Sequence, residues 1–423
     1  MLNNKPLRVA MLSLHSSPLG PLGTQNTGGM SVYVREVSRF LGARGHRIDI
    51  YTYVRGSREV QELYPNVRLI HLLGAEEQAI EKGQMAGRLN EIFETLERFR
   101  CANHLSYDLI HSHYWLSGVV GAMAQAHWRC PHLTMFHTLG IVKNSTASSE
   151  SEPDLRIAHE RWLAKVADYI VVPSAREMEN LLQHYRAPVH RAGLIPCGVN
   201  LERFKPMDRS LARKRLGIAP RDEVVLFVGR FAPLKGLDRL IEAVARVRTM
   251  RPGIRLLVIG GDGSRSRTTR SYHKLAAGLG VRDRISFVGR VEQPDLPPYY
   301  SAADLLALPS HYESFGLVVL ESLACGTPVV ATPVGTVETV IQNGLNGEII
   351  QAPRTKRIAA AIEKILSHPP ATRPPARTIR ETVGGCSWEN VAGEIDKAYA
   401  ELVQSHDPEQ VHAPYERCSV FPS

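Results

Sequence analysis

The strongest constraint on the fold is a regular alternation of short apolar runs with segments of helical periodicity. Near-continuous apolar runs such as 7–15 and 223–230 are typical of strands buried on both faces of a parallel sheet. The segment 30–46 differs, because its apolar residues recur at the spacing of one helix face. Strands that alternate with helices predict a parallel sheet covered by helices on both faces, which is an α/β fold.

This alternation runs through the chain twice. A chain of 423 residues is too long for one ordinary hydrophobic core, so we expect two domains. The break is expected at Pro196–Asn200, where PCGVN is typical of a turn and linker. We therefore predict two Rossmann-like, doubly wound parallel-sheet domains that face each other across a cleft, with ligands beyond the carboxyl ends of the strands.

The domain boundaries follow from the same pattern. Residues 1–198 form the first predicted domain and 199–385 the second, while a helix over 386–404 is expected to pack back. The tail 405–423 is predicted to be disordered. The first half is expected to contain a long helix over 77–104 and strands at 7–15, 47–53, 67–73, 108–115, 133–139, 169–174 and 193–200, and the second half strands at 223–230, 254–261, 284–290, 304–310, 328–333 and 347–350.

Composition and charge exclude several classes of protein. Apolar residues make up 43% of the chain and charged residues 22%, as in soluble globular proteins. No apolar run approaches the roughly 18 residues of a membrane span, and no signal-peptide cleavage site is seen, so a cytoplasmic location is expected. The six cysteines form no CxxC pair, which disfavours a disulfide framework or a zinc site.

The net charge of +9 points to anionic partners. Nucleic acid is disfavoured because the basic residues form no long run and no RNA-binding motif or zinc finger appears. Ligands that carry phosphate are favoured, while peripheral contact with a membrane surface stays open. The oligomeric state does not follow from the sequence, although a homodimer is possible.

A glycine-rich loop precedes the first predicted helix. Gly28 and Gly29 would allow the backbone to approach a ligand, and the helix start would offer free N–H groups to an anion. The alternative is an ordinary flexible turn. Because neither GxGxxG nor GxxxxGK[ST] is present, a nicotinamide cofactor and a P-loop enzyme are disfavoured.

Two cations follow the first strand of the second half. In GRFAPLKG, Arg230 and Lys235 suit the diphosphate of a nucleotide, since each charge-assisted hydrogen bond contributes roughly 1.5–3 kcal/mol. By itself the motif is weak, because solvated loops often carry such residues.

The segment HYESFGLVVLE places two glutamates around a helix start. We expect Phe315, Gly316 and Leu317 to present N–H groups to a phosphate or hydroxyl. Glu313 precedes this helix, whereas Glu321 lies in its second turn among apolar neighbours. A carboxylate that accepts two vicinal hydroxyls commonly recognises a ribose, so the pair is predicted to hold two parts of one sugar nucleotide.

Taken together, these motifs resemble a known family. HYESFGLVVLE and the following ACGTPVVATPVGTVETV resemble the E-x7-E signature of the family-four retaining glycosyltransferases of GT-B architecture, and the motifs from GGMSVYV to SWENVA cover nearly the whole chain. The resemblance implies that Glu313 meets the donor sugar, that Glu321 meets the ribose, and that Arg230 and Lys235 hold the diphosphate. It also implies that Gly29 approaches from the opposite domain.

The resemblance has further implications for the donor site. It places Gly261, in VIGGDG, beside the donor, and Arg290 beside the backbone that recognises the base. It implies neither a metal nor another cofactor, and the sequence contains no DxD motif.

In the first half, HSSPLGPLGTQNTGGMSVYV, YDLIHSHYWLSG and HTLGIVKNS resemble the D-inositol-3-phosphate glycosyltransferases and the sucrose-phosphate synthases. This implies that Lys82, Tyr114, Thr138 and Arg156 bind an acceptor phosphate. The chain departs from the inositol-phosphate enzymes at Ser31, because they read GGMN there. The resemblance therefore does not fix the acceptor.

Two histidines end predicted strands at the cleft. His137 is expected beside the donor sugar and is assigned to catalysis with Arg230, Lys235 and Glu313, while His113 is placed in a supporting role on the acceptor side. His15 is interpreted as structural.

The sequence thus predicts a metal-independent retaining glycosyltransferase that moves a sugar from a nucleotide diphosphate, most simply UDP, to a phosphorylated polyol or sugar. Attack on the same face as the departing diphosphate is the expected route, with positioning and charge supplied by the protein. A lipid- or oligosaccharide-acceptor enzyme, a sugar-nucleotide epimerase and a non-catalytic nucleotide-sugar binder remain alternatives.

Overall fold

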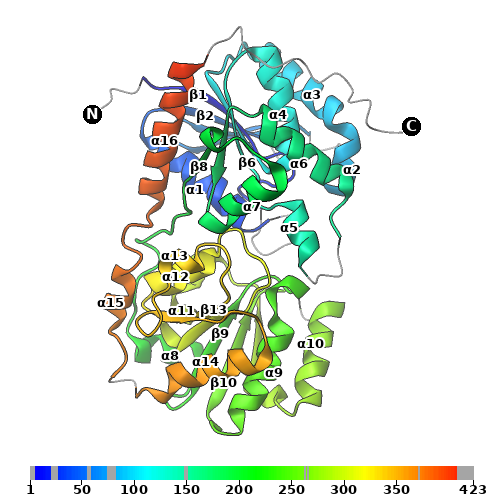
Figure 1. Cartoon of the computed structure of the whole chain (residues 1–423). Helices are drawn as coiled ribbons and strands as arrows, with labels where there is room; N and C mark the ends of the chain where they lie inside the picture. The colour runs from blue at the N-terminus through cyan, green and yellow to red at the C-terminus, as the bar shows by residue number, and fades with distance from the viewer. Residues whose placement is uncertain are drawn as a thin grey trace.

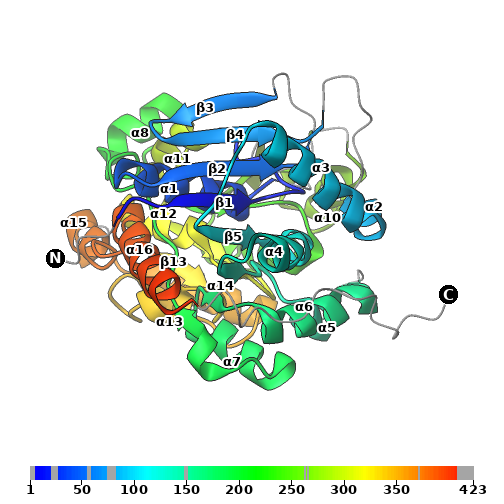
Figure 2. The ribbon, with the colours of Figure 1, turned by 90° about the horizontal axis from the view of Figure 1, so that it is seen from above.

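The computed structural model describes residues 5–20, 27–54, 59–73, 82–146, 151–261, 263, 266–369 and 372–406. Figure 1 shows two α/β units stacked one above the other, each built around its own sheet. Seen from above in Figure 2, the strands of the first sheet lie side by side between layers of helices. The predicted two-sheet α/β architecture is confirmed.

The first sheet has eight strands in the order β3-β4-β2-β1-β5-β6-β7-β8. All neighbouring pairs are parallel except β3 with β4, which is antiparallel. The order changes direction between β1 and β5, and loops at such a switch point bind ligands in this class of fold. The strands are β1 (Arg8–Leu12), β2 (Arg47–Thr52), β3 (Val60–Tyr64), β4 (Val67–His71), β5 (Leu109–His113), β6 (His132–Met135), β7 (Tyr169–Val172) and β8 (Ala192–Leu194).

The second sheet is entirely parallel, with the order β11-β10-β9-β12-β13-β14. This is the 3-2-1-4-5-6 arrangement of a doubly wound sheet, and its switch point lies between β9 and β12. The strands are β9 (Glu223–Val228), β10 (Ile254–Ile259), β11 (Ile285–Gly289), β12 (Leu305–Leu308), β13 (Val329–Ala331) and β14 (Gly347–Ile349). Each strand predicted from an apolar run is present in the two sheets.

One strand was not predicted from the sequence. The edge strand β3, with the sequence VQELY, is exposed or half-buried along its whole length. It therefore lacks the apolar run by which the other strands are recognised, and it pairs with β4 at an edge of the sheet. The expectation of a purely parallel first sheet is wrong at this edge.

Helices cover both faces of each sheet. In the first unit, α1 and α16 pack on one face and α3, α4, α6 and α7 on the other. In the second unit, α9, α10 and α14 share one core, while α11 and α12 belong to another. The helices of the first unit are α1 (Gly29–Ala43), α2 (Lys82–Met85), α3 (Leu89–Ala102), α4 (Tyr114–Trp128), α5 (Gly140–Ser145), α6 (Asp154–Val166) and α7 (Ala175–Tyr185).

The helices that follow are α8 (Arg209–Leu216), α9 (Leu237–Arg248), α10 (Arg267–Gly278), α11 (Pro297–Ala302), α12 (Leu317–Ala324), α13 (Val337–Val340), α14 (Thr355–Ser367), α15 (Ala376–Glu381) and α16 (Trp388–Ser405). Short 3₁₀ turns are η1 (Ala86–Arg88), η2 (Val189–Arg191), η3 (Pro233–Lys235), η4 (Arg282–Arg284) and η5 (Gln293–Asp295). The helix expected over 77–104 is divided into α2, η1 and α3, and its first residues lie outside the described part of the chain.

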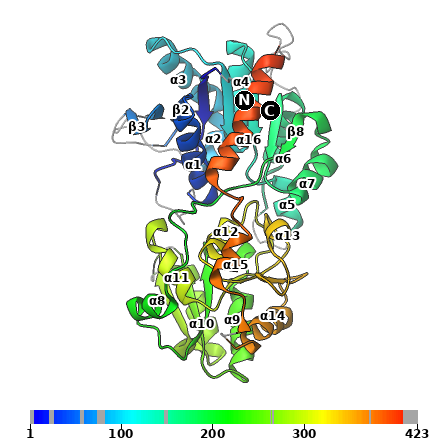
Figure 3. The same ribbon diagram turned by 90° about the vertical axis from the view of Figure 1, so that its left-hand side faces the viewer.

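The last helix, α16, packs on the first unit, although it follows the second unit in the sequence. Figure 3 shows α15 beside the second sheet and α16 beside the first. Ser387 caps α16 by accepting the N–H of Asn390 at 3.1 Å, and Trp388, Ile395 and Tyr399 then pack into the core that α1 shares with the first sheet. The chain thus returns to the first unit after completing the second.

The chain passes between the two units twice, near Val199 and near Ser387. Val199 and Ser387 form an isolated parallel bridge, which places the two crossings side by side. A β-carbon on Gly198 would lie 2.8 Å from Trp388, so this crossing requires glycine. In the described part of the chain, no helix is both long and apolar enough to cross a bilayer.

Candidate active site

The loops after β9 and β12 bring together two residues predicted for the donor site. The Lys235 ammonium, at the end of η3, forms an ion pair with the Glu313 carboxylate. The Ser310 hydroxyl donates to the same carboxylate at 3.1 Å. Both charged side chains are largely buried. A cation and an anion are therefore held in contact at the switch point of the second sheet.

The backbone of these loops depends on two glycines. Gly236 ends η3 with φ of +66°, and a β-carbon there would lie 2.3 Å from the Pro309 carbonyl oxygen. Gly316 precedes α12 with φ of +70°. Because L-residues with side chains rarely adopt this conformation, the two glycines explain how the Lys235 loop approaches the Glu313 loop. The predicted helix start at Gly316 is confirmed.

Glu321 is buried on α12 with both carboxylate oxygens occupied. It accepts hydrogen bonds from the Gln293 amide at 3.0 Å and from the Tyr300 hydroxyl at 2.7 Å. Burial raises the pKa of Glu321 to about 6. Gln293 in turn accepts from Arg35 on α1 at 2.7 Å and from Arg203 at 3.0 Å. The carboxylate predicted to meet the ribose is thus linked through one amide to the first domain.

The start of α1 lies directly opposite the start of α12. A β-carbon on Gly29 would lie 3.4 Å from the Phe315 ring and 3.6 Å from Leu317. The Phe315 ring stacks on Tyr33 of α1, with ring centroids 5.9 Å apart. Gly28 precedes this helix in an extended conformation. The two helix starts that were predicted to bind the donor therefore approach each other across the domain boundary.

His137 and His113 form a buried pair beneath this contact. Their rings share a hydrogen bond of 2.9 Å between Nδ1 of His113 and Nε2 of His137. His137 has φ of +60° and meets the Phe315 ring edge-on at 5.3 Å. Burial lowers the pKa of both histidines well below the ordinary value, so both rings are neutral at pH 7. His113 is thus the hydrogen-bond partner of His137. The predicted contact of His113 with the acceptor stays a prediction.

The residues predicted for an acceptor phosphate gather around one aromatic ring. The Lys82 ammonium lies 4.3 Å and the Arg156 guanidinium 4.8 Å from the centroid of Tyr114. Arg156 also donates to the Thr138 hydroxyl at 2.8 Å and to its carbonyl oxygen at 2.7 Å. Tyr114 itself has φ of +75°, a strained conformation for an aromatic residue. The structure thus brings all four predicted residues together.

Charge in this cluster is only partly balanced. Arg156 is ion-paired with Glu160 at 2.7 Å and with Glu152 at 2.8 Å. Burial, and next the charge of Arg156, lower the pKa of Lys82 to about 8. Arg230 acts on Lys82 in the same direction from the second domain. Three cations therefore converge here, and an anion between them would stabilise their charged forms.

The remaining predicted donor residues lie at the rim. Arg230 is exposed after β9. Gly261 is buried with φ of +86°, and a β-carbon there would lie 2.5 Å from the Phe231 ring. Arg290 is exposed at the carboxyl end of β11, at the edge of the second sheet. Among the residues that the structure describes, no group of three or more His, Cys, Asp or Glu side chains is arranged to hold a metal ion.

Sequence reasoning missed several residues of this region. His15 was interpreted as structural, and its ring lies 4.4 Å from Tyr114; burial, followed by the charges of Lys82 and Arg156, lowers its pKa well below the ordinary value. Its position just after a strand is the same signal that singled out His137. Gln293 and Tyr312 carried no comparable signal, since their partners come from elements distant in the sequence.

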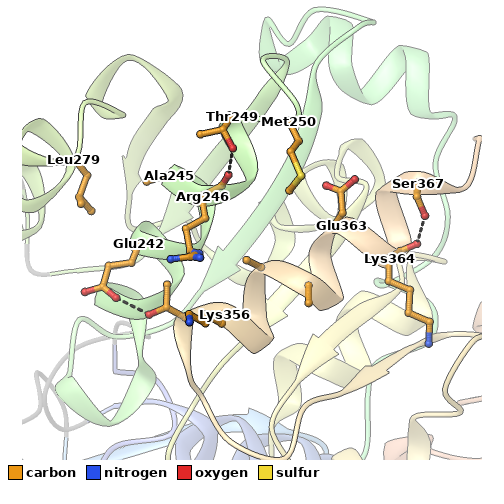
Figure 4. Close-up of a pocket in the computed structure, with 13 residues that line it drawn as sticks. Glu242, Ala245, Arg246, Thr249, Met250, Leu279, Lys356, Glu363, Lys364 and Ser367 are labelled. Atoms are coloured by element: carbon orange, nitrogen blue, oxygen red, sulfur yellow. Dashed lines mark hydrogen bonds between the residues drawn. The ribbon is translucent and has the colours of Figure 1, made fainter.

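An open groove of about 1230 Å³ lies elsewhere, between α9 and α14 on the second domain (Figure 4). Its lining mixes acidic, basic and apolar side chains, such as Glu363, Lys356 and Met250. None of the predicted site residues lines it. The predicted site residues therefore lie outside this groove.

Comparison with known proteins identifies the class. Residues 27–203 match the family model described as Glycosyltransferase Family 4, and residues 208–382 match the model described as Glycosyl transferases group 1. The D-inositol 3-phosphate glycosyltransferase of Geodermatophilus obscurus is 39% identical over 404 residues, which cover 93% of this chain and 89% of the relative. The enzyme of the same name from Rhodococcus jostii is 36% identical over 407 residues, covering 94% and 90%.

Solved structures show the same likeness. The sucrose-phosphate synthase of Thermosynechococcus elongatus has a TM-score of 0.86 and 31% identity, and the match covers 94% of this chain and 99% of that one. HepE of Anabaena, in complex with UDP and glucose, has a TM-score of 0.73 at 20% identity, which shows the fold alone. The chain belongs to glycosyltransferase family 4 and has the GT-B fold. It is an enzyme that uses a nucleotide sugar as donor, as the sequence predicted.

Proposed function

We propose that this glycosyltransferase transfers a sugar from a UDP-sugar to a hydroxyl of a phosphorylated polyol or sugar. The observation that carries the proposal is the cation pair around Tyr114. Lys82 and Arg156 flank one ring, and Arg156 also donates to the Thr138 hydroxyl. A phosphate between these groups would form charge-assisted hydrogen bonds worth roughly 1.5–3 kcal/mol each.

The comparisons support the same substrate classes. Relatives that are named for D-inositol 3-phosphate are up to 39% identical to this chain, and a sucrose-phosphate synthase is 31% identical. UDP is proposed as the nucleotide of the donor, and the assay of UDP release described below tests this choice. Ser31 on α1 is buried, with its hydroxyl 2.8 Å from that of Ser16.

We propose that transfer proceeds with retention and without a metal. Retention through a covalent intermediate requires two carboxyl groups about 5 Å apart, whereas Glu313 is engaged by Lys235 and Ser310. That arrangement supports a role for Glu313 in holding sugar hydroxyls. The departing diphosphate would take the proton of the acceptor hydroxyl, and Lys235 and Arg230 would stabilise the charge that develops on it. His137, being neutral, would orient the donor sugar.

The first test is UDP release from UDP-glucose and UDP-N-acetylglucosamine. Each donor is incubated with D-inositol 3-phosphate or with hexose phosphates, and each acceptor is paired with its unphosphorylated counterpart as a control. Release that depends on the phosphorylated member of a pair is expected. Release that is equal with and without any acceptor, or that is restricted to lipid or oligosaccharide acceptors, would contradict the proposal.

Two further measurements separate the finer claims. The anomeric configuration of the product, read by proton NMR, tests retention. A chelator added to the assay tests metal independence. The rate of UDP release is expected to stay unchanged.

A further inference from the structure

Tyr312 lies in the loop between β12 and α12, next to Glu313, and its hydroxyl reaches into the first domain. It accepts the N–H of Leu139 at 3.1 Å and the hydroxyl of Ser314 at 3.3 Å. It donates to Glu177 of α7, with the two carboxylate oxygens at 3.2 and 3.4 Å. A tyrosine hydroxyl has one donor and two acceptor positions, so this group is fully used by partners from both domains.

The Leu139 N–H belongs to the proposed acceptor loop. Leu139 follows Thr138 and caps the start of α5, where the first N–H groups of a helix have no partner within it. The N–H of Gly140 donates to Glu160 at 2.9 Å, and the N–H of Ile141 donates to the Tyr185 hydroxyl at 3.0 Å. These two partners come from the first domain. The partner of Leu139 comes from the second domain.

Glu177 is placed to orient the Tyr312 hydroxyl. Ser174 caps α7 and accepts the Glu177 N–H at 3.2 Å, which is the first half of a capping box. In such a box the glutamate usually bonds back to the N–H of the capping residue. Here its carboxyl group is buried, with 6% of the residue exposed, and it faces Tyr312. Burial raises the pKa of Glu177 to about 8.

The adjacent contact between the domains is of a different kind. Arg176 on the same helix pairs with Glu338 of α13 at 2.8 Å, but about half of each side chain is exposed. Exposed pairs of this type contribute little and are screened by salt. The two loops are therefore positioned by buried contacts: the Tyr312 hydrogen bond to Leu139, and the contact of the His137 and Phe315 rings.

We propose that Tyr312 is a positioning residue: its hydroxyl, oriented by Glu177, holds the Leu139 N–H when the two domains meet, and so aligns the acceptor loop with the donor loop that carries Glu313. This inference rests on the proposed function, because the role of Thr138 in binding the acceptor belongs to that proposal. Because the Tyr312 hydroxyl reaches Leu139 only across the domain boundary, acceptor binding would depend on how the two domains close.

The experiment compares Tyr312→Phe with Arg176→Ala in the full-length enzyme. Tyr312→Phe keeps the ring and removes the hydroxyl, so the KM for the phosphorylated acceptor is expected to rise about threefold to tenfold, the range of one lost hydrogen bond. The Kd for UDP, measured by calorimetry, is expected to stay within about twofold because Glu313 and Lys235 are unchanged. Arg176→Ala removes the exposed contact on the same helix and is expected to leave both quantities unchanged.

Three results would overturn the inference. They are an equal loss of UDP affinity and acceptor affinity in Tyr312→Phe, no change in either, or the same change in Arg176→Ala. Glu177→Gln keeps an acceptor oxygen for the Tyr312 hydroxyl and is expected to retain a lower acceptor KM than Glu177→Ala. Equal values for these two variants would exclude the orienting role of Glu177.

Amide hydrogen exchange separates this inference from the proposed function. In the presence of UDP, the Leu139 amide is expected to exchange faster in Tyr312→Phe than in the wild type, whether or not any acceptor is turned over. If the wild type transfers sugar to no phosphorylated acceptor but this difference is present, the proposed acceptor fails and the contact stands. If exchange at Leu139 is unchanged, the positioning role itself is wrong.

Discussion

The donor and acceptor sides of the site differ in how far their charges are balanced. On the donor side, Lys235 and Glu313 neutralise each other and Glu321 is hydrogen-bonded by Gln293 and Tyr300. On the acceptor side, Lys82 and Arg156 both approach the Tyr114 ring. Arg156 is paired there with Glu160 and Glu152, and burial, followed by the charge of Arg156, lowers the pKa of Lys82 to about 8. The charges of Lys235 and Glu313 are therefore balanced without a ligand, whereas an anion on the acceptor side would favour the cationic form of Lys82.

The backbone differs between the two sides as well. The donor loops turn at Gly236 and Gly316, which adopt positive φ without strain. On the first domain, by contrast, Tyr114 on the acceptor side has φ of +75° and His137, predicted beside the donor sugar, has φ of +60°, although side chains disfavour this region. Such strain persists where the surrounding structure over-determines it, as at functional sites. Here α4 and the aromatic contacts of His137 supply that support.

The largest effect on turnover is expected from removing Lys235 on the donor side. Lys235→Ala removes the cation proposed to stabilise the departing diphosphate, so kcat should fall about 10²–10³-fold with any acceptor. Steady-state kinetics with saturating acceptor would measure this. Lys274→Ala, an exposed lysine on α10, is the matched control. A kcat near that of the wild type would contradict the assignment of Lys235.

A smaller effect is expected from altering the acceptor side. Arg156→Lys retains a charge beside Glu160 but loses the planar fork that bonds Thr138. The KM for a phosphorylated acceptor should rise about 10- to 100-fold, since one or two charge-assisted bonds are lost, while the Kd for UDP stays unchanged. Arg161→Lys, exposed on the same helix, serves as the control. An equal loss with unphosphorylated acceptors would show that Arg156 does not bind phosphate.

The smallest effect concerns the pH dependence of the acceptor side. The pKa of Lys82 is lowered to about 8, chiefly by burial and next by the charge of Arg156. Its cationic form is therefore present below that pH and lost above it. The acceptor KM should rise by up to about tenfold between pH 7 and 9. Because a guanidinium stays charged over this range, Lys82→Arg should flatten the profile; an unchanged profile would exclude Lys82 as the titrating group.

Much of this molecule was predictable because its signals are local. Buried parallel strands leave continuous apolar runs, and the carboxyl ends of such strands meet at one edge of each sheet. For this reason the sequence already predicts that Lys235, Glu313 and Glu321 lie in one place. Strand β3 escaped prediction because its side chains are exposed or half-buried, so no apolar run marks it.

Other features arise from contacts between distant segments. The Arg35–Gln293 bond joins residues that are 258 positions apart, and the Leu139–Tyr312 bond joins residues that are 173 positions apart. No periodicity or motif encodes such pairs, since each depends on how the two domains dock. His15 lies between these cases, because its place at the end of a strand was visible but its partner Tyr114 was not.

The sequence by itself therefore determined the two doubly wound sheets, the family, and the set of charged residues at the strand ends, because these depend on local patterning and short motifs. The tertiary structure alone decided which charges are paired and which remain in excess, and which side chains join the domains. The pairing of Lys235 with Glu313 and the approach of Lys82 and Arg156 to the Tyr114 ring depend on distances of a few ångströms, and those are set by packing across the whole chain.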